Sequence, residues 1–449
     1  MSDAPLGPDP LPDPQRLTHR RVVAIAGPIV LSNATVPLLG LVDTGVVGQL
    51  GQAAPIGAVG IGAVILSSIY WIFGFLRMGT TGMVAQSHGS GDGAEVGAHL
   101  LRALTIGGVA GLAFILLQAP LIWAAFQLAP ATTEVETLAR DYLSIRIWGA
   151  PATIGLYAIT GWLIALERTR SVLVLQVLQN GLNVVLDVWF VLGLGWGVGG
   201  VALATLMAEW SGILLGLWFA RHALVAALRA AQGPTRLFAR DKLARLAQVN
   251  GNIMIRSVLL QASFTTFMFM AAGHGDVTLA ANQVLLQFLG ITAYALDGFA
   301  FAAESLVGQA VGARRPQAVR RAAILTSQWG VAGAVALGLV FWFGGPAIID
   351  LLTTAPAVRE AARDYLFWML LAPLIGIASW MFDGIFIGAT MTREMRTAML
   401  QAVAVYAVAL VVLPPLFGNQ GLWAALMILN AARGLTMARL YPRVEAAAR

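Results

Sequence analysis

The chain of 449 residues contains no cysteine and few charged residues. The absence of cysteine excludes disulfide bonds, thiolate metal sites and a cysteine nucleophile. Charged residues make up 11% of the chain, well below the share in a typical soluble domain. Hydrophobic residues make up 58%, which is more than a soluble protein of this length can bury. The composition therefore predicts a polytopic membrane protein and excludes an ordinary cytosolic enzyme.

Histidine is also scarce, and its five copies are scattered along the chain. Four of them lie beside or inside charged loops, which is typical of interfacial residues and not of a metal site. We therefore predict no catalytic residue and no metal ligand. Gly195, Gly197 and Gly200 have the spacing of a dinucleotide-binding motif, but they follow a predicted membrane helix instead of a strand, so that interpretation fails.

Long apolar runs take the place of the missing charge. A bilayer core of about 30 Å is crossed by roughly 20 helical residues, and runs of this length without alternation favour helices over barrel strands. We predict an all-α membrane protein whose twelve transmembrane helices span residues 22–47, 56–85, 101–128, 140–166, 171–196, 198–222, 245–271, 278–311, 319–345, 363–390, 396–418 and 420–440. The predicted helices follow a tail rich in proline and aspartate, and no cleavable signal peptide is expected.

The basic residues lie mostly on one side of these predicted helices. Of the 28 lysines and arginines, only Arg140, Arg359 and Arg363 fall in loops on the opposite side. Basic loops stay in the cytoplasm, so both termini are predicted to be cytoplasmic. The net charge of +6 thus reports membrane topology, and no nucleic-acid partner is expected.

The second half of the chain repeats the first. The pentapeptide at residues 139–143 recurs letter for letter at residues 362–366, and Gly161 meets Gly384 at the same offset. Two copies of six helices have the same orientation in the membrane, which is an arrangement of alternating-access transporters. We predict a disordered cytoplasmic tail, an N-lobe, a basic cytoplasmic linker and a C-lobe over residues 1–15, 16–222, 223–244 and 245–449.

Four polar residues at similar predicted depth form the main candidate site. Ionisable groups within membrane helices are costly, so each is a functional candidate. Asp43 lies near the outer end of the first predicted helix, and Asp187 and Thr205 lie in the outer halves of the fifth and sixth. Asn183 precedes Asp187 by one helical turn and shares its face. We predict a proton or cation site here, and the alternative that the acids only bond to neighbouring helices stays open.

Other charged residues within the predicted helices are candidates for substrate binding or gating. They are Arg77, Arg256, Asp297, Glu304 and Asp383. Arg146 and Glu209 also lie within the fourth and sixth predicted helices, and neither is assigned to a site. Arg256 and Asp297 could pair, either structurally or as a substrate contact, and Asp383 could be a cytoplasmic gate or an anchor. Arg77 could neutralise an acid or reach polar backbone.

Two prolines interrupt the hydrogen bonds of the first predicted helix. Pro28 and Pro37 each remove a backbone donor, so this helix can bend. Because the same helix carries Asp43, its bending could be coupled to protonation of that acid.

At these residues the sequence resembles the multidrug and toxic compound extrusion (MATE) transporters, and among them the branch named for the DNA-damage-inducible protein F. The resemblance covers essentially the whole chain after the tail. The segments that carry it are residues 36–44, 75–82, 183–189, 202–205, 293–300 and 383–390.

The resemblance implies a two-lobed exporter driven by a proton or sodium gradient, with no cofactor. In similar transporters the N-lobe pocket uses an aspartate, an asparagine with a second aspartate, and a threonine on the helices that here carry Asp43, Asn183, Asp187 and Thr205. Sodium-coupled members also have a glutamate on the seventh helix. This chain has Asn250 and Arg256 there instead, which favours proton coupling and leaves sodium (Na+) open.

We therefore expect a proton-coupled antiporter that exports amphipathic, often cationic, organic compounds. The alternatives are sodium-coupled export by the same fold and a lipid-linked sugar flippase of the same superfamily, whose members commonly have fourteen spans and a strongly cationic cavity. The expected partners are small organic molecules and the lipid bilayer, and one copy is expected to suffice for transport. The expected location is the bacterial cytoplasmic (inner) membrane.

Overall fold

The structure of the chain is a computed structural model that describes residues 17–128, 131–230 and 237–449. The predicted tail, residues 1–15, and part of the predicted linker lie outside the described residues. The side chains of Pro37, Leu38, Leu39, Leu41, Thr44 and Leu128 lie outside this description as well.

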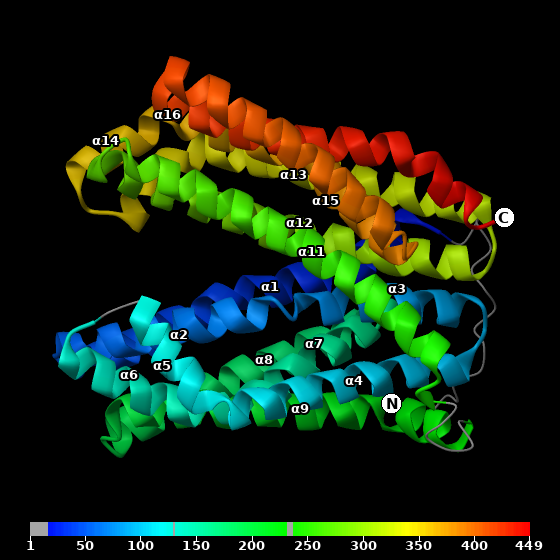
Figure 1. The fold of residues 1–449 in the computed structure, drawn as a ribbon, viewed down its shortest axis with the longest axis horizontal. Helices are drawn as coiled ribbons and strands as arrows, with labels where there is room; N and C mark the ends of the chain where they lie inside the picture. The colour runs from blue at the N-terminus through cyan, green and yellow to red at the C-terminus, as the bar shows by residue number, and fades with distance from the viewer. Residues whose placement is uncertain (1–16, 129–130, 231–236) are drawn as a thin grey trace. The chain divides into compact units, whose positions relative to one another are not determined.

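All secondary structure in these described ranges is helical (Figure 1). The first half contains α1 (His19–Gly48), α2 (Ala53–Trp71), α3 (Gly74–Gly89), α4 (Gly93–Leu116), α5 (Gln118–Leu128), α6 (Thr133–Arg146), α7 (Ala150–Ala165), α8 (Thr169–Asp187) and α9 (Gly197–Ala230). A short 3-10 helix, η2 (Ile147–Gly149), and a π-helix, η3 (Val188–Gly193), follow α6 and α8. The second half contains α11 (Arg240–Ala272), α12 (Asp276–Gly312), α13 (Pro316–Leu352), α14 (Pro356–Asp364), α15 (Leu366–Gly388) and α16 (Thr392–Ala446).

These helices confirm the predicted class of membrane protein. Ten of the described helical segments are long and apolar enough to cross a membrane. The last of them, α16, contains two of the predicted spans. It is kinked at the predicted boundary between them, where Gly418 has non-helical angles (φ 55°, ψ −137°). Helix α1, with 30 residues, covers the first predicted span. Each of the twelve predicted spans therefore falls mainly on helix.

Several predicted spans are broken into two helices. The span 56–85 divides between α2 and α3, and the span 101–128 divides at Leu117. The span 363–390 divides at Tyr365, between α14 and α15. The apolar runs continue through these breaks, which is why hydropathy alone did not reveal them.

The described residues pack as two compact units, and boundaries between the units fall within α1 and α11. Leu31–Ser87 and Asp92–Arg245 belong to the first unit, and Leu246–Arg449 belongs to the second. The second unit also includes α1 up to Val30, although the predicted N-lobe contained all of α1. The cause is local, because Gly298 of α12 has no side chain and so lets α12 approach the backbone of Ala26.

One close helix contact occurs in both units and reflects the repeat. In the first unit, a Cβ atom on Gly161 of α7 would collide with the backbone carbonyl of Arg77 in α3. In the second unit, a Cβ atom on Gly384 of α15 would collide with the carbonyl of Ala300 in α12 in the same way. Each pair of helices can approach this closely only because glycine has no side chain.

The second unit has an aromatic core, and buried hydrogen bonds lie at the kink of α16. The rings of Phe267 and Trp423 lie 4.7 Å apart between centroids. The buried amides of Asn282 and Asn419 donate to each other at 2.7 and 3.0 Å. Trp423 Nε1 also donates to Asn282 at 2.8 Å. These bonds join α12 to α16 directly after Gly418, so the kink is held by buried hydrogen bonds.

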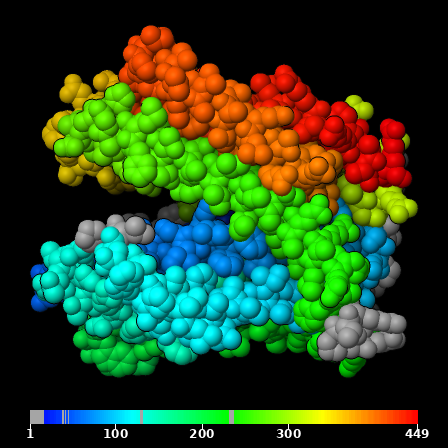
Figure 2. All heavy atoms as spheres, viewed as in Figure 1, coloured from blue at the N-terminus to red at the C-terminus, as the bar shows by residue number. Residues whose placement is uncertain are grey.

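The outer surface of the helices is apolar, as a lipid-facing surface requires. On α4, the side chains of Leu112 and Leu116 are 54% and 73% exposed. Trp123 of α5 is likewise exposed. Figure 2 shows that α4 and α5, in cyan, contribute to one face of the first unit. Exposed apolar patches of this kind mark contact with a membrane or a partner, and the length of the helices identifies the membrane.

Candidate functional site

The first unit buries the four polar residues that the sequence predicts as a coupling site. They are Asp43 on α1, Asn183 and Asp187 on α8, and Thr205 on α9. The Asn183 amide donates to Thr205 Oγ1 at 3.1 Å. The Thr205 hydroxyl donates in turn to the carbonyl of Val201 at 3.0 Å. The structure thus brings residues from three helices into one buried cluster.

The two carboxyl groups of this cluster are neighbours. Asp43 and Asp187 interact directly, and Asp187 also faces Asn183. Among the described residues, no group donates a hydrogen bond to either oxygen of Asp187, and the buried amide oxygen of Asn183 also receives none. Ionised carboxylates only accept hydrogen bonds. A proton or a small cation would therefore satisfy these oxygens.

The backbone next to Asp187 is irregular. Helix α8 ends at Asp187 and continues as the π-helix η3, a type of turn that is frequent at functional sites. The chain then reverses through Gly195 and Gly197, which have positive φ angles of 71° and 55°. The ring of Phe190 stacks on that of Trp196 with centroids 5.0 Å apart. This turn fixes where α9 begins and so places Thr205 beside Asn183.

A buried ion pair lies beside the two aspartates. Arg146, at the end of α6, donates to Glu209 of α9 at 2.6 Å. Both residues are less than one-tenth exposed. Arg146 attracts Asp43 and Asp187, and Glu209 repels Asp43. The buried cluster therefore contains three acids and one base.

Sequence reasoning placed Arg146 and Glu209 within membrane helices but did not assign them to the site. Both lie on helices that enter from the same predicted side of the membrane, but their positions in the predicted spans differ by more than one helical turn, so depth alone did not pair them. Their pairing depends on the rotation of α6 against α9, which a hydropathy pattern does not report.

The other first-half candidates take different places. Arg77 lies on α3, where its carbonyl accepts a hydrogen bond from Thr81 at 2.8 Å and lies against Gly161. Its backbone is thus part of a helix contact, and a substrate role for its side chain stays a prediction. Helix α1 runs without a break through Pro28 and Pro37. The side chain of Pro37 lies outside the described residues, and bending at these prolines also stays a prediction.

The second unit contains a separate buried charge cluster. Arg256 of α11 and Arg433 of α16 both donate to Asp383 Oδ2 of α15, the latter at 2.7 Å. Arg433 also donates to Asn430 at 3.2 Å. Asp383 therefore anchors three helices to one another. Sequence reasoning did not single out Arg433, which lies within α16 and is buried.

The remaining candidates, Asp297 and Glu304, lie on α12. Glu304 is buried, whereas Asp297 is partly exposed. The carbonyl of Glu304 lies against Gly388 of α15, where a Cβ atom would collide with it. The backbone at Glu304 thus contributes to the packing of α12 on α15.

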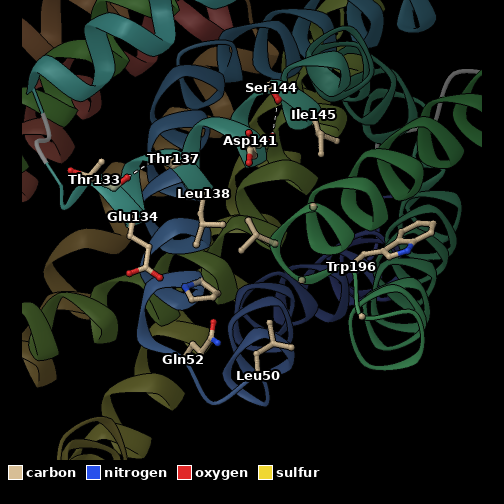
Figure 3. A pocket seen from close by; sticks show the side chains of 15 residues that line it. Leu50, Gln52, Thr133, Glu134, Thr137, Leu138, Asp141, Ser144, Ile145 and Trp196 are labelled. Atoms are coloured by element: carbon tan, nitrogen blue, oxygen red, sulfur yellow. Dashed lines mark hydrogen bonds between the residues drawn. The ribbon is translucent and has the colours of Figure 1, made fainter.

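A pocket of 1160 Å³ opens at the end of the first unit where α1 ends and α6 begins. Its described lining includes the acids Glu134 and Asp141 and no basic residue. Figure 3 shows Glu134 and Leu138 of α6 near Gln52, which follows α1. Ile145, the neighbour of Arg146 in the sequence, also lines the pocket. The pocket thus borders the segment that carries the buried ion pair.

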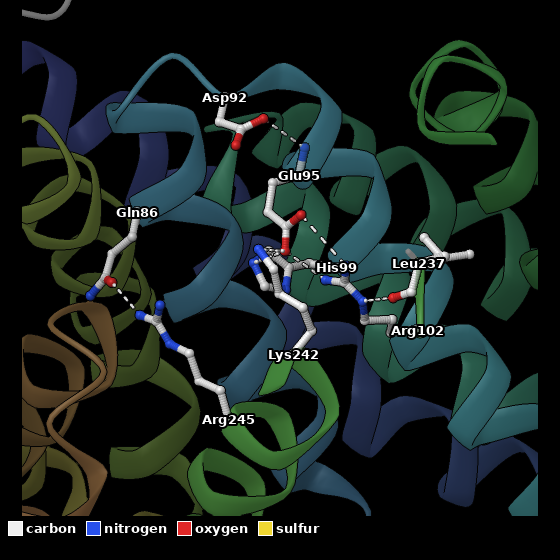
Figure 4. A network of polar contacts seen from close by, with 8 residues as sticks. All are labelled: Gln86, Asp92, Glu95, His99, Arg102, Leu237, Lys242 and Arg245. Carbon is white, nitrogen blue, oxygen red and sulfur yellow. Dashed lines mark hydrogen bonds and ion pairs between the residues drawn. The ribbon is translucent and has the colours of Figure 1, made fainter. Parts of the chain in front are cut away.

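A polar network at the opposite end of the first unit centres on Glu95 (Figure 4). Glu95 accepts from Arg102 at 2.7 Å and from Lys242 at 3.2 Å. Arg102 Nε donates to the carbonyl of Leu237 at 2.6 Å. Asp92 caps α4 by accepting from the Glu95 amide at 3.0 Å. The network ties the described end of the predicted linker to α4.

Comparison with known proteins identifies the family. The MatE family model matches the chain twice, over residues 28–189 and 253–414. The chain belongs to the MatE family. The two matches also confirm the internal repeat. This MatE protein is 40% identical over 425 residues to the DNA damage-inducible protein F of Escherichia coli, covering 93% of this chain and 91% of that one. It is 27% identical over 466 residues to the probable multidrug resistance protein NorM of Pseudomonas aeruginosa, covering 96% and 92%.

Solved structures show the same fold. A multidrug resistance MATE family transporter in an outward-facing conformation matches this MatE chain with a TM-score of 0.80 at 21% identity, covering 97% of each chain. A MOP superfamily transporter from Pyrococcus furiosus matches with a TM-score of 0.81 at 20% identity, covering 98% of each. The predicted family and two-lobed helical fold are therefore confirmed. The protein is a multi-pass membrane transporter of a drug and toxic compound efflux family, and not an enzyme.

Proposed function

We propose that this MatE protein is a proton-coupled antiporter that exports amphipathic organic cations. The observation that carries the proposal is the buried contact between Asp43 and Asp187, with Asn183 and Thr205 beside them. Two neighbouring carboxylates within a membrane helix bundle are costly when both are ionised. Such a pair is better suited to exchanging a positive charge than to packing.

Exchange follows from competition for one negative charge. When a proton binds, one carboxyl group donates a hydrogen bond to the other, and the pair loses one negative charge. When the proton leaves, the same negative charge attracts a cationic substrate. Because the two positive charges exclude each other at Asp43 and Asp187, entry of a proton from outside would release the substrate outward.

The proposed orientation places both termini in the cytoplasm, with the chain in the inner membrane of a bacterium and functional as a monomer. The asymmetry of basic residues supports it. In this orientation the acidic pocket lined by Glu134 and Asp141 opens to the outside. The network around Glu95 then lies on the cytoplasmic side, where basic residues are expected.

Sodium is the second candidate for the coupling ion. The carboxylates, the amide oxygen of Asn183 and the hydroxyl of Thr205 form a set of oxygen ligands, which suits hard cations. A lipid-linked sugar flippase is less well supported, because the buried cluster around Asp43 and Asp187 contains three acids and one base, Arg146.

A transport assay in proteoliposomes tests the proposal. Uptake of tetraphenylphosphonium is measured with a proton gradient alone and with a sodium gradient alone. We expect the proton gradient to drive uptake by the wild type. We expect Asp43→Asn to reduce that uptake to the level of empty liposomes, because an amide cannot exchange a proton in this range.

Asp241→Asn serves as the matched control, because Asp241 is an exposed acid at the start of α11. It should transport as the wild type does. Normal proton-driven uptake by Asp43→Asn would contradict the mechanism, and uptake driven by sodium alone would assign sodium to the site.

A further inference from the structure

The ion pair of Arg146 and Glu209 has no part in the exchange described above, yet it lies in the same buried cluster. We infer that this pair is an internal counter-charge that sets the pH range over which Asp43 and Asp187 exchange their proton. The inference rests on the proposed function, because it concerns the same site. Arg146 and Glu209 are positioning residues in this scheme.

The structure makes specific room for this pair. A Cβ atom at residue 149 would collide with Glu209 Oε2, so any residue other than glycine there would displace the carboxylate from its position. Gly149 belongs to the 3-10 helix η2, which follows Arg146 directly. The buried Tyr142, one turn before Arg146 on α6, also faces the guanidinium. The irregular turn and the glycine together bring the two charges to 2.6 Å.

Stability does not explain a buried pair of this kind. Removing two charges from water costs several kcal/mol per ion, and apolar residues of similar volume often stabilise a protein as well or better. Both side chains here are nearly inaccessible. A different benefit must therefore accompany the pair, and its neighbours indicate which one.

The pair acts electrostatically on the exchanging acids. Arg146 attracts both Asp43 and Asp187, whereas Glu209 repels Asp43. While the two charges are paired, their fields largely cancel at the aspartates. Without Glu209, the positive charge of Arg146 would stabilise the ionised aspartates and lower their affinity for a proton. Without Arg146, the negative charge of Glu209 would raise the affinity of the aspartates for a proton.

Other titratable groups also surround the pair. They are the buried or nearly buried tyrosines Tyr70 of α2, Tyr142 of α6 and Tyr157 of α7, together with Arg77 of α3, which faces Tyr157. Free tyrosine loses its proton only near pH 10, and arginine stays charged throughout. The pH range over which Asp43 and Asp187 exchange their proton should therefore depend on the charges of the three acids and of Arg146.

Proton release on substrate binding provides the test. The purified full chain is placed in weakly buffered detergent solution with an indicator dye, and tetraphenylphosphonium is added over a series of pH values. We expect Glu209→Gln to shift the midpoint of proton release to lower pH by about one unit or more, as an unneutralised charge nearby does. Arg146→Met should shift it to higher pH.

The double variant Arg146→Met with Glu209→Gln removes both charges and should return the midpoint close to the wild-type value. Arg146→Lys keeps the positive charge, so its midpoint of proton release should also stay close to the wild-type value. These two variants keep the test informative where a single variant fails to fold. A midpoint that is unchanged in Glu209→Gln, or not restored in the double variant, overturns the inference.

The same measurement separates this inference from the proposed function. If the wild type releases no proton, or if Asp43→Asn releases as many as the wild type, then the proposed function fails. If the wild type releases protons and Asp43→Asn does not, the function stands and only the charge variants decide about Arg146 and Glu209.

Discussion

The two buried charge clusters, one in each unit, have opposite balances of acidic and basic side chains. In the first unit, the acids Asp43, Asp187 and Glu209 outnumber Arg146, so the cluster favours an added positive charge. In the second unit, two arginines share the carboxylate of Asp383. That carboxylate is already bonded on one oxygen by two guanidinium groups. The proposed proton exchange therefore belongs to the first cluster, and helix anchoring belongs to the second.

The anchoring role of Asp383 predicts a large loss of stability on its neutralisation. Asp383→Asn would leave the buried guanidinium groups of Arg256 and Arg433 without this carboxylate. Breaking a buried pair in this way typically costs about 3–5 kcal/mol. We expect a clear drop in the midpoint of thermal unfolding in detergent.

The double variant Asp383→Asn with Arg256→Met restores the net charge of the cluster, so it should be more stable than Asp383→Asn alone. Asp43→Asn should unfold near the wild-type midpoint, since its acid is not bonded to a buried base. Equal loss in Asp43→Asn and Asp383→Asn would contradict the division of roles.

At the scale of helices, the irregular segments lie where function or folding needs them. The π-helix η3 follows Asp187, and the 3-10 helix η2 follows Arg146, so both irregular segments adjoin the charged cluster. The kink of α16 at Gly418 adjoins the paired amides of Asn282 and Asn419. In each case a local break in the helix positions a polar group that a straight helix would misplace.

Because α16 is kinked at Gly418, we expect any other residue at this position to destabilise the protein. The angles of Gly418 (φ 55°, ψ −137°) are ones that residues with a Cβ atom rarely adopt. Gly418→Ala should therefore lower the stability by about 1–3 kcal/mol, and the thermal unfolding midpoint should fall accordingly.

Gly344→Ala is the matched control, because Gly344 lies within α13 and a Cβ atom there would meet open space. It should leave the midpoint unchanged or raise it slightly, since alanine favours helix. A Gly418→Ala variant as stable as Gly344→Ala would mean that the kink is not required.

At the scale of the whole molecule, two copies of one helical unit are joined in a single chain. The family model matches both copies, and the contact of Gly161 with the backbone of Arg77 recurs as that of Gly384 with Ala300. The repeat preserves the helix contacts but not the charges, because the alanine at 300 corresponds to the arginine at 77. The two copies thus share a fold and differ in chemistry.

The proposed orientation can be tested on the natural sequence background, because the chain has no cysteine. Gln52 and Ala447 are exposed residues near the end of α1 and at the C-terminus. We expect Gln52→Cys to react with a membrane-impermeant maleimide in intact spheroplasts. Ala447→Cys should react only after lysis. The reverse pattern would invert the topology and, with it, the proposed direction of export.

The sequence by itself determined the membrane class, the twelve spans and the repeat. These features depend on local composition, because each helix must be apolar along its length to lie in lipid. The sequence also predicted Asp43, Asn183, Asp187 and Thr205 as one site, since acids within membrane helices are rare and their depth can be estimated from the rise of a helix.

Only the tertiary structure decided which charges are partners. Arg146 meets Glu209, and Arg433 joins Arg256 on Asp383, and none of these pairs follows from hydropathy. Depth along a helix can be read from the sequence, but the rotation of one helix against another is set by packing, such as the close approach that a glycine allows. Partner choice within each unit depends on that rotation.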